Sequence, residues 1–510
     1  MNHDKDYYFK LENGSDIRGV ALEGIEGEHV TLTPAAARDL SKSFVHFVAD
    51  KYSKKANQLR IAVGHDSRLS ADILKQAVIE GILETGAAAA DCGLSSTPSM
   101  FMATVLPGLT YDASIMITAS HLPFNRNGLK FFTGEGGLEH EDIHAITTAA
   151  VEERYSECVE KEDRQAVEVC PLLEHYSAHL RKIICEALPE GGEKPFSGLH
   201  VVVDAGNGAG GFFANKVLSP LGADISGSVF LEPDGHFPNH IPNPENPDAM
   251  EAIRKATIES GADLGLIFDT DVDRSAAVFA NGDEINRNAI IALMGAIVAH
   301  DHPGTTIVTD SVTSDELTVF LEEELGLKHH RFKRGYRNVI NESMRLNREG
   351  IDSQLAIETS GHGALKENYF LDDGAYMSVK ILIELARCKA QGKAIDAMIS
   401  KLNHPKEAAE CRFKIRLEEF KEYGLDVLSQ FESFVEKEEG FKKAPVNYEG
   451  IRVNIHREGI DGWLLLRMSL HDPILPLNIE TKQEGGVEQI KAWIRPFFEQ
   501  FERLDITSLF

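Results

Sequence analysis

The chain of 510 residues carries a formal net charge of -28. At roughly 100–200 residues per domain, this length predicts about three to five domains. The charge excludes nucleic acid and anionic membranes as general partners, because both would be repelled unless a local basic patch overrode it. An anionic substrate would therefore need Arg and Lys side chains concentrated in one cleft.

The spacing of the cysteines and the length of the hydrophobic segments indicate the cellular compartment. The six cysteines form no C-x-x-C pair and are too sparse for a disulfide framework or a zinc site, which favours a reducing environment. The N-terminus is polar, and no apolar run approaches the ~20 residues that span a bilayer. We expect a cytoplasmic protein without membrane segments.

The first part of the chain alternates strands with helices, which predicts an α/β unit with a largely parallel sheet. The expected elements are helix 34–52, strand 61–63, helix 70–86, strand 87–91, strand 113–117 and a charged helical stretch at 139–165. Strand 113–117 runs into Thr118-Ala119-Ser120-His121-Leu122-Pro123. Loops on rigid strands often carry chemistry, which makes the Ser120 hydroxyl a candidate. However, most serines in turns only bond their own backbone.

Two further units repeat this plan without a fixed period. Their expected elements are strand 200–203, helix 212–221, helix 248–261, strand 264–268, helix 287–300, strand 306–309, helix 314–326 and strand 354–357. From about residue 404 the pattern changes to partly alternating strands at 411–417, 450–456, 463–470 and 474–480, followed by a helix at 486–503. This last part predicts a smaller α+β domain with an antiparallel sheet.

The sharpest motif is Asp269-x-Asp271-x-Asp273-Arg274, directly after strand 264–268. Three carboxylates on one side of an extended segment repel one another, so a bound cation is the natural explanation. All-oxygen ligation favours a hard cation such as Mg²⁺. A calcium-binding EF-hand needs Gly and Glu where this chain has Arg274 and Ala280, so that alternative fails. A solvated acidic turn remains the plain alternative.

A glycine pattern, Gly206-x-Gly208-x-x-Gly211, matches a dinucleotide-binding fingerprint in outline. The acidic residue that should follow about 20 residues later is not cleanly placed. We therefore favour a purely structural role, in which the glycines permit a tight turn between strand and helix.

Three weaker motifs could bind a sugar phosphate. Glu358-x-Ser360-Gly361-His362 offers hydroxyl-binding groups and a titratable imidazole. Arg467-x-Ser469 could hold a phosphate. A basic turn at a predicted helix start could hold an anion too, through Lys333, Arg334 and Arg337. Each is also compatible with an ordinary turn or an exposed strand.

Taken in order, the Thr-Ala-Ser-His-x-Pro, Asp-x-Asp-x-Asp-Arg and Glu-x-Ser-Gly-His loops resemble those of the α-D-phosphohexomutase family, which includes phosphoglucomutases, phosphomannomutases and phosphoglucosamine mutases. The resemblance covers nearly the whole chain. It implies an α/β fold with three related three-layer α/β/α domains and a smaller C-terminal α+β domain, similar to the TATA-binding protein, around a central cleft. The matching boundaries are 1–170, 171–284, 285–403 and 404–510, for the phosphoserine, metal, sugar and phosphate domains.

The resemblance also implies roles for individual residues. Ser120 would be the phosphoserine, and the Mg²⁺ ligands would be Asp269, Asp271, Asp273 and a phosphoserine oxygen. Catalytic groups around the transferring phosphate would be Arg18, Lys130 and His121, with His362 as a candidate general base. Substrate contacts would come from Arg274, Glu358, Ser360, Arg467, Ser469, Lys333 and Tyr336. The chain departs from the family pattern at Leu122, Ile357, Tyr336, Leu470 and His471, which bears on phosphate contacts and sugar preference.

These expectations define an enzyme that interconverts hexose 1-phosphate and hexose 6-phosphate of glucose, mannose or both. The resemblance implies Mg²⁺ and a hexose 1,6-bisphosphate primer as cofactors, and the partner would be a small phosphosugar, with the chain a monomer or homodimer. Phosphoglucosamine mutase is the first alternative. A phosphatase acting on phospho-Ser120 is less favoured, as is a sugar-phosphate-binding protein with a decayed site, because Ser120, Lys130 and the three aspartates are all present.

Overall fold

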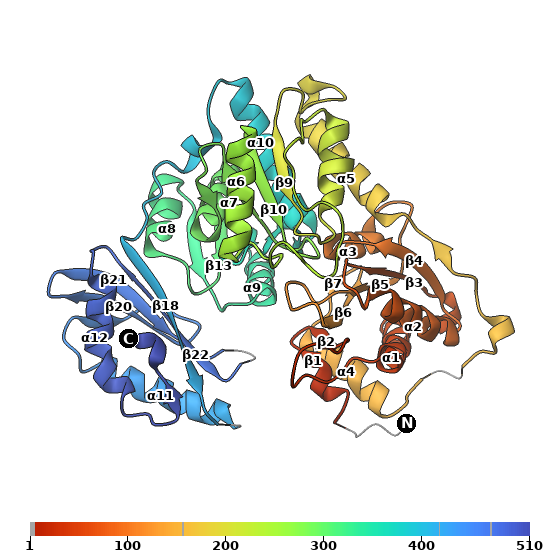
Figure 1. Ribbon diagram of the computed structural model, residues 1–510, viewed down its shortest axis with the longest axis horizontal. Coiled ribbons are helices and arrows are strands. Elements are labelled where there is room, and N and C mark those ends of the chain that lie inside the picture. The colour runs from red at the N-terminus through yellow and green to blue at the C-terminus, as the bar shows by residue number, and fades with distance from the viewer. Residues whose placement is uncertain (1–5, 156–157, 418, 470–471) are drawn as a thin grey trace. The chain divides into compact units, whose positions relative to one another are not determined.

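The computed structural model describes residues 6–155, 158–417, 419–469 and 472–510 (Figure 1). The chain divides into two compact units. The first unit comprises Met1–Asn286 and Ser360–Ala397, and the second comprises Arg287–Thr359 and Met398–Phe510. Among the described helices, none is long and apolar enough to cross a membrane.

The first unit begins with an eight-stranded mixed sheet in the order β1-β2-β6-β5-β3-β4-β8, with β7 beside β6. The strands are β1 (Glu12–Asn13), β2 (Asp16–Val20), β3 (Arg60–His65), β4 (Ala88–Leu94), β5 (Ala113–Ile117), β6 (Arg126–Thr133), β7 (Gly136–Gly137) and β8 (Glu168–Val169). β5, β3, β4 and β8 are parallel, whereas β6 is antiparallel to both β5 and β2. The loops after β3 and β5 therefore leave the sheet at the same edge.

Helices cover both faces of this sheet. α1 (Pro34–Tyr52), α2 (Ala71–Glu84) and α4 (His140–Val151) share one core with β3, β5 and β6, in which the rings of Phe44 and Phe131 lie 4.7 Å apart between centroids. Because side chains alternate along a strand, Ser114 of β5 points to the other face. There its hydroxyl donates to the Met100 carbonyl of α3 (Thr97–Val105) across 2.6 Å.

The first unit also contains a four-stranded sheet in the order β12-β11-β10-β9. Its strands are β9 (Val201–Asp204), β10 (Leu264–Phe268), β11 (Ser275–Phe279) and β12 (Glu284–Ile285). α6 (Pro247–Ser260) packs on it through a small apolar core. The unit is completed by α5 (Leu172–Ala187), the hairpin of β16 (Gly363–Leu365) and β17 (Leu371–Asp372), and α10 (Gly374–Ala390). β10 and β11 form a hairpin whose connecting loop carries the three aspartates.

The second unit contains a parallel set of strands in which β13 (Thr306–Thr309) lies between β14 (Lys328–Arg331) and β15 (Ser353–Ile357). Its helices are α7 (Arg287–Asp301), α8 (Asp315–Val319) and α9 (Tyr336–Arg348). The C-terminal domain is an antiparallel sheet in the order β19-β20-β21-β22-β18-β23. The strands are β18 (Glu407–Ile415), β19 (Phe441–Lys443), β20 (Ile451–Arg457), β21 (Ile460–Leu466), β22 (Ile474–Thr481) and β23 (Leu504–Asp505).

Two helices, α11 (Phe420–Val435) and α12 (Gly486–Phe498), pack on one face of the C-terminal sheet (Figure 1). Their aromatic side chains interlock, as in the stack of Phe431 on Phe498 with ring centroids 5.5 Å apart. The predicted fold class, three α/β domains followed by a smaller α+β domain, is confirmed.

Several predicted boundaries were wrong. The helix expected at 139–165 ends at Val151, and residues 156–157 lie outside the described part of the chain. The helix expected at 212–221 is a π-helical turn, Phe213–Leu218, followed by a 3₁₀ turn. The helix expected at 314–326 is likewise the short α8 continued by a π-helical turn, Phe320–Glu324. Helices α3, α5 and α11 were not predicted.

Candidate active site

The Ser120 loop is held from beneath by a buried arginine that was not among the predicted site residues. Arg68 donates hydrogen bonds to the carbonyl oxygens of Pro123 and Arg126 at 2.8 and 2.9 Å, to that of Leu122 at 2.6 Å, and to that of Ser120. Ser120 has a φ of 50°, which is unusual for a residue other than glycine. Four charge-assisted bonds to carbonyls of the serine and of residues that follow it can hold this strained turn.

Asp66 completes this support. Its carboxylate lies 3.3 Å from Nε of Arg68 and accepts a 2.7 Å hydrogen bond from the Thr118 hydroxyl. Thr118 Oγ1 in turn accepts the Ser120 amide at 2.9 Å. Because β3 and β5 are parallel neighbours, the loop after β3 reaches the loop after β5. The sheet topology thus explains why residues of one loop position the other.

The Ser120 hydroxyl lies between a cation and a carboxylate. Arg274 Nη2 is 2.9 Å from Ser120 Oγ, and Ser120 Oγ donates to Asp269 Oδ2 across 3.0 Å. His121 Nδ1 is 3.4 Å from the same hydroxyl and 2.5 Å from Arg274 Nη2. Arg274 and burial together lower the pKa of His121 to about 2. His121 is therefore a neutral acceptor for Arg274 here, and it cannot supply positive charge.

The three aspartates meet as the motif predicted. One carboxylate oxygen from each of Asp269, Asp271 and Asp273 lies within 4.8 Å of the others, and all three residues are buried. Oδ1 of Asp271 and Oδ1 of Asp273 make no hydrogen bond in the described part of the chain. Buried carboxylate oxygens left in this state are costly unless a cation binds them. The all-oxygen donor set fits Mg²⁺.

The pKa values of two carboxyl groups in the aspartate loop are shifted in opposite directions. Burial and the two neighbouring carboxylates raise the pKa of Asp269 well above its ordinary value. For Asp273, burial is outweighed by Lys130, His362 and Arg274, which lower its pKa. Lys130 Nζ lies 3.1 Å from Asp271 Oδ2 and 2.5 Å from Asp273 Oδ2. The structure thus brings Lys130 to the acidic loop.

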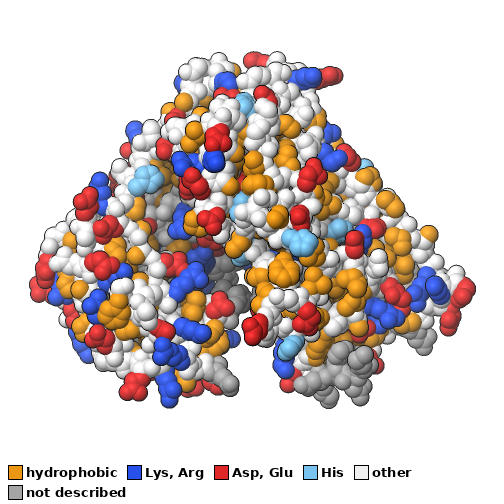
Figure 2. Space-filling model, in the orientation of Figure 1, with side chains coloured by type: hydrophobic (Ala, Val, Ile, Leu, Met, Phe, Trp, Pro, Cys, Tyr) orange, Lys and Arg blue, Asp and Glu red, His pale blue; other side chains and the backbone are white. Residues whose placement is uncertain are grey.

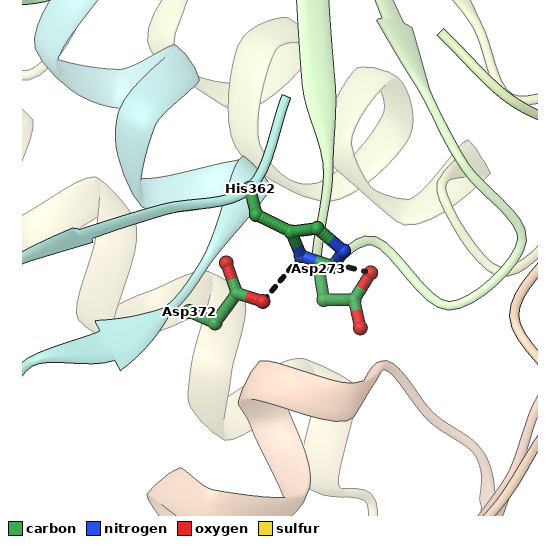
Figure 3. A group of neighbouring side chains, drawn as sticks. All are labelled: Asp273, His362 and Asp372. Atoms are coloured by element: carbon green, nitrogen blue, oxygen red, sulfur yellow. Dashed lines mark hydrogen bonds and ion pairs between the residues drawn. The ribbon is translucent and has the colours of Figure 1, made fainter. Parts of the chain in front are cut away.

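His362 sits between two carboxylates, as Figure 3 shows. Its Nδ1 atom is hydrogen-bonded to Asp372 and lies 3.9 Å from Asp273 Oδ1. The ring reaches this position because His362 forms an isolated antiparallel bridge with Arg274. Burial lowers the pKa of His362, but Asp372 and Asp273 outweigh it and raise the pKa above its ordinary value. Asp372 was missed from the sequence.

Two more predicted residues lie in the first unit. Arg18 donates to the Thr118 carbonyl and lies 2.8 Å from Asp16 Oδ2, so it contacts the base of the serine loop. Ser360 is buried at the start of the 360–362 turn. Gly361 adopts a φ of 93°, and a Cβ atom there would lie 2.7 Å from the Ser275 carbonyl oxygen. The turn therefore packs tightly on the start of β11.

The second unit brings together a different set of predicted residues. Glu358 Oε1 accepts the Gly335 amide at 2.6 Å, just before Tyr336 opens α9. Glu449, which was not predicted, accepts the Arg334 amide at 3.1 Å and lies 4.0 Å from Arg467 Nη1. Lys333, in the same turn, is exposed. A helix N-terminus and two arginines are thereby combined, and such a combination suits an anion.

Arg467 lies on the C-terminal sheet face that is turned away from α11 and α12. Its amide donates to the Pro476 carbonyl at 3.1 Å, and Pro476 pairs with Arg412 of β18, so these side chains share one face. Figure 2 shows several Lys and Arg side chains over this domain. Burial and Arg334 lower the pKa of Arg467. Ser469 follows, with its amide on the Ile474 carbonyl at 3.1 Å, and Leu470 and His471 lie outside the described residues.

The glycine motif serves packing, as expected. A Cβ atom on Gly208 would lie 2.6 Å from the Thr270 carbonyl oxygen, and one on Gly211 would lie 2.2 Å from that of Leu231. The Gly208 contact fixes the loop after β9 directly against the aspartate loop.

A further missed contact joins the two sheets of the first unit. Thr97, at the start of α3, donates its amide to the Asp271 carbonyl at 2.8 Å, and its hydroxyl donates to the Asp271 carboxylate. Ser96 caps α3 by accepting the Ser99 amide. The Ser-Ser-Thr-Pro sequence at 95–98 has the form of a helix N-terminus, so a local signal for the start of α3 is present.

Comparison with known proteins agrees with this geometry. The models of phosphoglucomutase/phosphomannomutase α/β/α domains I, II and III match residues 10–157, 174–282 and 286–404 in that order. The chain therefore belongs to the phosphoglucomutase/phosphomannomutase family of α-D-phosphohexomutases, and it is a phosphohexomutase.

Individual relatives cover most of the chain. A Pseudomonas putida protein named phosphomannomutase/phosphoglucomutase is 29% identical over 86% of this chain and 86% of its own length. A phosphoglucosamine mutase from Lactobacillus delbrueckii is 30% identical over 74% of this chain and 80% of its own. A crystal structure of a phosphoglucomutase/phosphomannomutase family protein from Burkholderia thailandensis superposes with a TM-score of 0.77 at 24% identity, covering 98% of both chains.

Proposed function

We propose that this enzyme interconverts the 1-phosphates and 6-phosphates of glucose and mannose through phospho-Ser120 and a bound hexose 1,6-bisphosphate. One observation carries the proposal. The Ser120 hydroxyl lies 2.9 Å from Arg274 and 3.0 Å from Asp269, beside a buried carboxylate cluster suited to a divalent cation. Phosphoryl transfer depends mostly on positioning and charge neutralisation, and this arrangement provides both.

Each residue around Ser120 has a proposed role in phosphoryl transfer. Ser120 donates its phosphoryl group to the free hydroxyl of a hexose monophosphate and recovers the other phosphoryl group after the sugar has turned over. Asp269, Asp271 and Asp273 would hold Mg²⁺, which when bound offsets the charge on the transferring group. Arg274 binds oxygens around Ser120, and Lys130 adds a second cation. His362 remains a proposed proton acceptor, held in place by Asp372.

Residues of the second unit are proposed to bind the part of the substrate that does not react. Glu358 would accept hydrogen bonds from sugar hydroxyls, and Ser360 is proposed for the same role. Arg467, Ser469 and the turn of Lys333 and Tyr336 would hold the second phosphate. We retain the proposed domain boundaries at 170, 284 and 403.

Phosphoglucosamine mutase is the second candidate, and the 30% identity to the Lactobacillus enzyme of that name favours keeping it. The test is conversion of the 1-phosphates of glucose, mannose and glucosamine to the 6-phosphates, with Mg²⁺ and a matching bisphosphate primer. Turnover of glucose and mannose substrates at comparable kcat/KM supports the proposal. Preferential turnover of the amino sugar contradicts it, and steady release of inorganic phosphate without a sugar acceptor would indicate a phosphatase.

A further inference from the structure

Two cysteines far apart in the sequence lie at neighbouring positions in the first unit, with Cys92 in β4 and Cys170 directly after β8. β4 and β8 are parallel, with Ala90 opposite Glu168 and Asp91 opposite Val169. Continuing this register places Cys92 opposite Cys170, and the Cys170 amide donates to the Asp91 carbonyl across 2.9 Å. Neighbouring strands lie about 4.8 Å apart. That spacing falls within the Cα separation of about 4.4–6.8 Å that a disulfide spans.

Both cysteine residues are shielded from solvent. Cys92 is 6% exposed and Cys170 is 3% exposed. A hydrogen bond from the Cys92 thiol lowers the pKa of Cys170, and the Tyr111 hydroxyl adds to this effect. The pKa of Cys92 is raised by the same contact and by burial. One member of the pair is thus prepared as a thiolate nucleophile and the other as its resolving thiol.

The strand that directly precedes Cys170 is short and exposed. β8 is two residues long and lies at the edge of the sheet, and Val169 is 82% exposed. Short edge strands with few buried contacts open locally at low cost in free energy. Such opening would admit a small oxidant and let the two sulfur atoms approach bonding distance.

We propose that Cys92 and Cys170 form a redox-modification site, at which a hydroperoxide oxidises the two thiols to an intramolecular disulfide. The Cys170 thiolate attacks the peroxide, so the O–O bond breaks, a sulfenic acid forms and the leaving oxygen departs as water or alcohol after taking a proton. The Cys92 thiol then attacks the Cys170 sulfur, the S–S bond forms, and water leaves. Two electrons pass from the two thiols to one peroxide.

The cysteine pair is connected to the aspartate loop through β4. An effect of oxidation on activity through this connection rests on the proposed function. Cys92 is the extra residue where β4 bulges against β3, since Val63 pairs with Asp91 and Gly64 with Gly93. β4 leads within a few residues to Thr97, which holds the Asp271 backbone and carboxylate. Drawing Cys92 toward β8 would shift this bulge, and we expect lower mutase activity in the oxidised enzyme.

The experiment treats the full-length enzyme with hydrogen peroxide, blocks remaining thiols, and maps peptides by mass spectrometry without reductant. The expected product is a peptide pair linked through Cys92 and Cys170, with two thiols lost per chain and both recovered with dithiothreitol. Cys92→Ser and Cys170→Ser should each abolish the linked pair, whereas Cys158→Ser, at an exposed position, should leave it unchanged. This readout does not depend on which sugar the enzyme uses.

Oxidation confined to Cys158, or sulfinic acid at Cys170 with an intact Cys92 thiol, would overturn the proposal. For the link to the active site, we expect turnover of the linked enzyme to fall on the order of fivefold or more, reversibly and only when both cysteines are present. A linked enzyme with unchanged turnover would overturn that coupling.

Discussion

Arg274 and Ser120 are joined by a 2.9 Å hydrogen bond although 154 positions separate them in the chain. The same guanidinium contacts His121 and lies 3.5 Å from Asp269. Arg274→Lys keeps the positive charge. A lysine ammonium lacks the planar set of N–H donors with which the guanidinium contacts several groups at once. We expect kcat to fall by about 10²-fold. This is the typical loss when an enzyme lacks one hydrogen-bond donor to the charge that develops in the transition state. Arg254→Lys, in an exposed helix pair with Glu251, is the matched control and should leave kcat unchanged.

The aspartate loop gives a prediction about metal affinity. Asp271→Asn removes one carboxylate charge from the cluster while keeping its volume, so Mg²⁺ affinity should fall by about tenfold or more. Calorimetric titration measures this affinity without substrate. Asp283→Asn, in an exposed turn of the same sheet, should bind Mg²⁺ like the parent enzyme. Equal affinity for Mg²⁺ in Asp271→Asn and the parent would place the metal elsewhere.

Arg68 gives a different prediction, because this residue is only 2% exposed and its hydrogen bonds go to the backbone of the serine loop. A lysine at this position cannot reach four carbonyls, so Arg68→Lys should lower kcat by about 10²-fold through misplacement of Ser120, with little change in KM. Addition of guanidinium to Arg68→Ala should restore part of kcat, whereas added ammonium should not. Arg126→Lys is the control, since Arg126 pairs with Glu28 at a half-exposed site.

How much could be predicted from the sequence depended on the range of the interactions. Strands 113–117, 264–268 and 306–309 were predicted with their observed limits, because each is a short apolar run bounded by turn residues. The three aspartates were found because their spacing is local. The Arg68 support and the Thr97–Asp271 contact were missed, because they join residues 52 and 174 positions apart. Only the strand order brings such pairs together, and no local pattern encodes it.

A half-buried histidine in the second unit predicts how stability depends on pH. The His329 ring is bonded on both nitrogens to Thr309 and Thr318, each at 2.8 Å. Burial and the neighbouring Arg331 hold its pKa well below the ordinary value. Below about pH 6.5 the His329 imidazole is protonated in the unfolded chain but stays neutral in the folded protein. This residue should therefore lower the free energy of unfolding by up to about 1.4 kcal/mol for each pH unit below that point.

The comparison of the parent with His329→Gln isolates this effect, because glutamine does not titrate. Urea unfolding at pH 7.5 and at pH 5.5 should show a larger loss of stability in the parent than in the variant. A parent and variant that lose the same free energy of unfolding between these pH values would contradict the assignment.

The proposed phosphate contacts of the second unit predict a KM effect. Arg467→Ala removes a cation from the group formed with Arg334 and Glu449, and we expect KM for a hexose monophosphate to rise by about tenfold or more. Arg412→Ala removes an exposed cation from the same sheet face and serves as the control. An unchanged KM in Arg467→Ala would remove this residue from the substrate site.

The state of Ser120 during turnover tests the central claim most directly. The enzyme is incubated with Mg²⁺ and a hexose 1,6-bisphosphate whose phosphoryl groups carry an isotope label, then separated, digested and analysed by mass spectrometry, before and after addition of unlabelled hexose 6-phosphate. The account predicts one labelled phosphoryl group on Ser120, which passes to the added sugar and is replaced on Ser120 by an unlabelled one within a single turnover, and no turnover in Ser120→Ala. A Ser120→Ala enzyme with the parent's mutase rate, or phosphate found only at another residue, would contradict it.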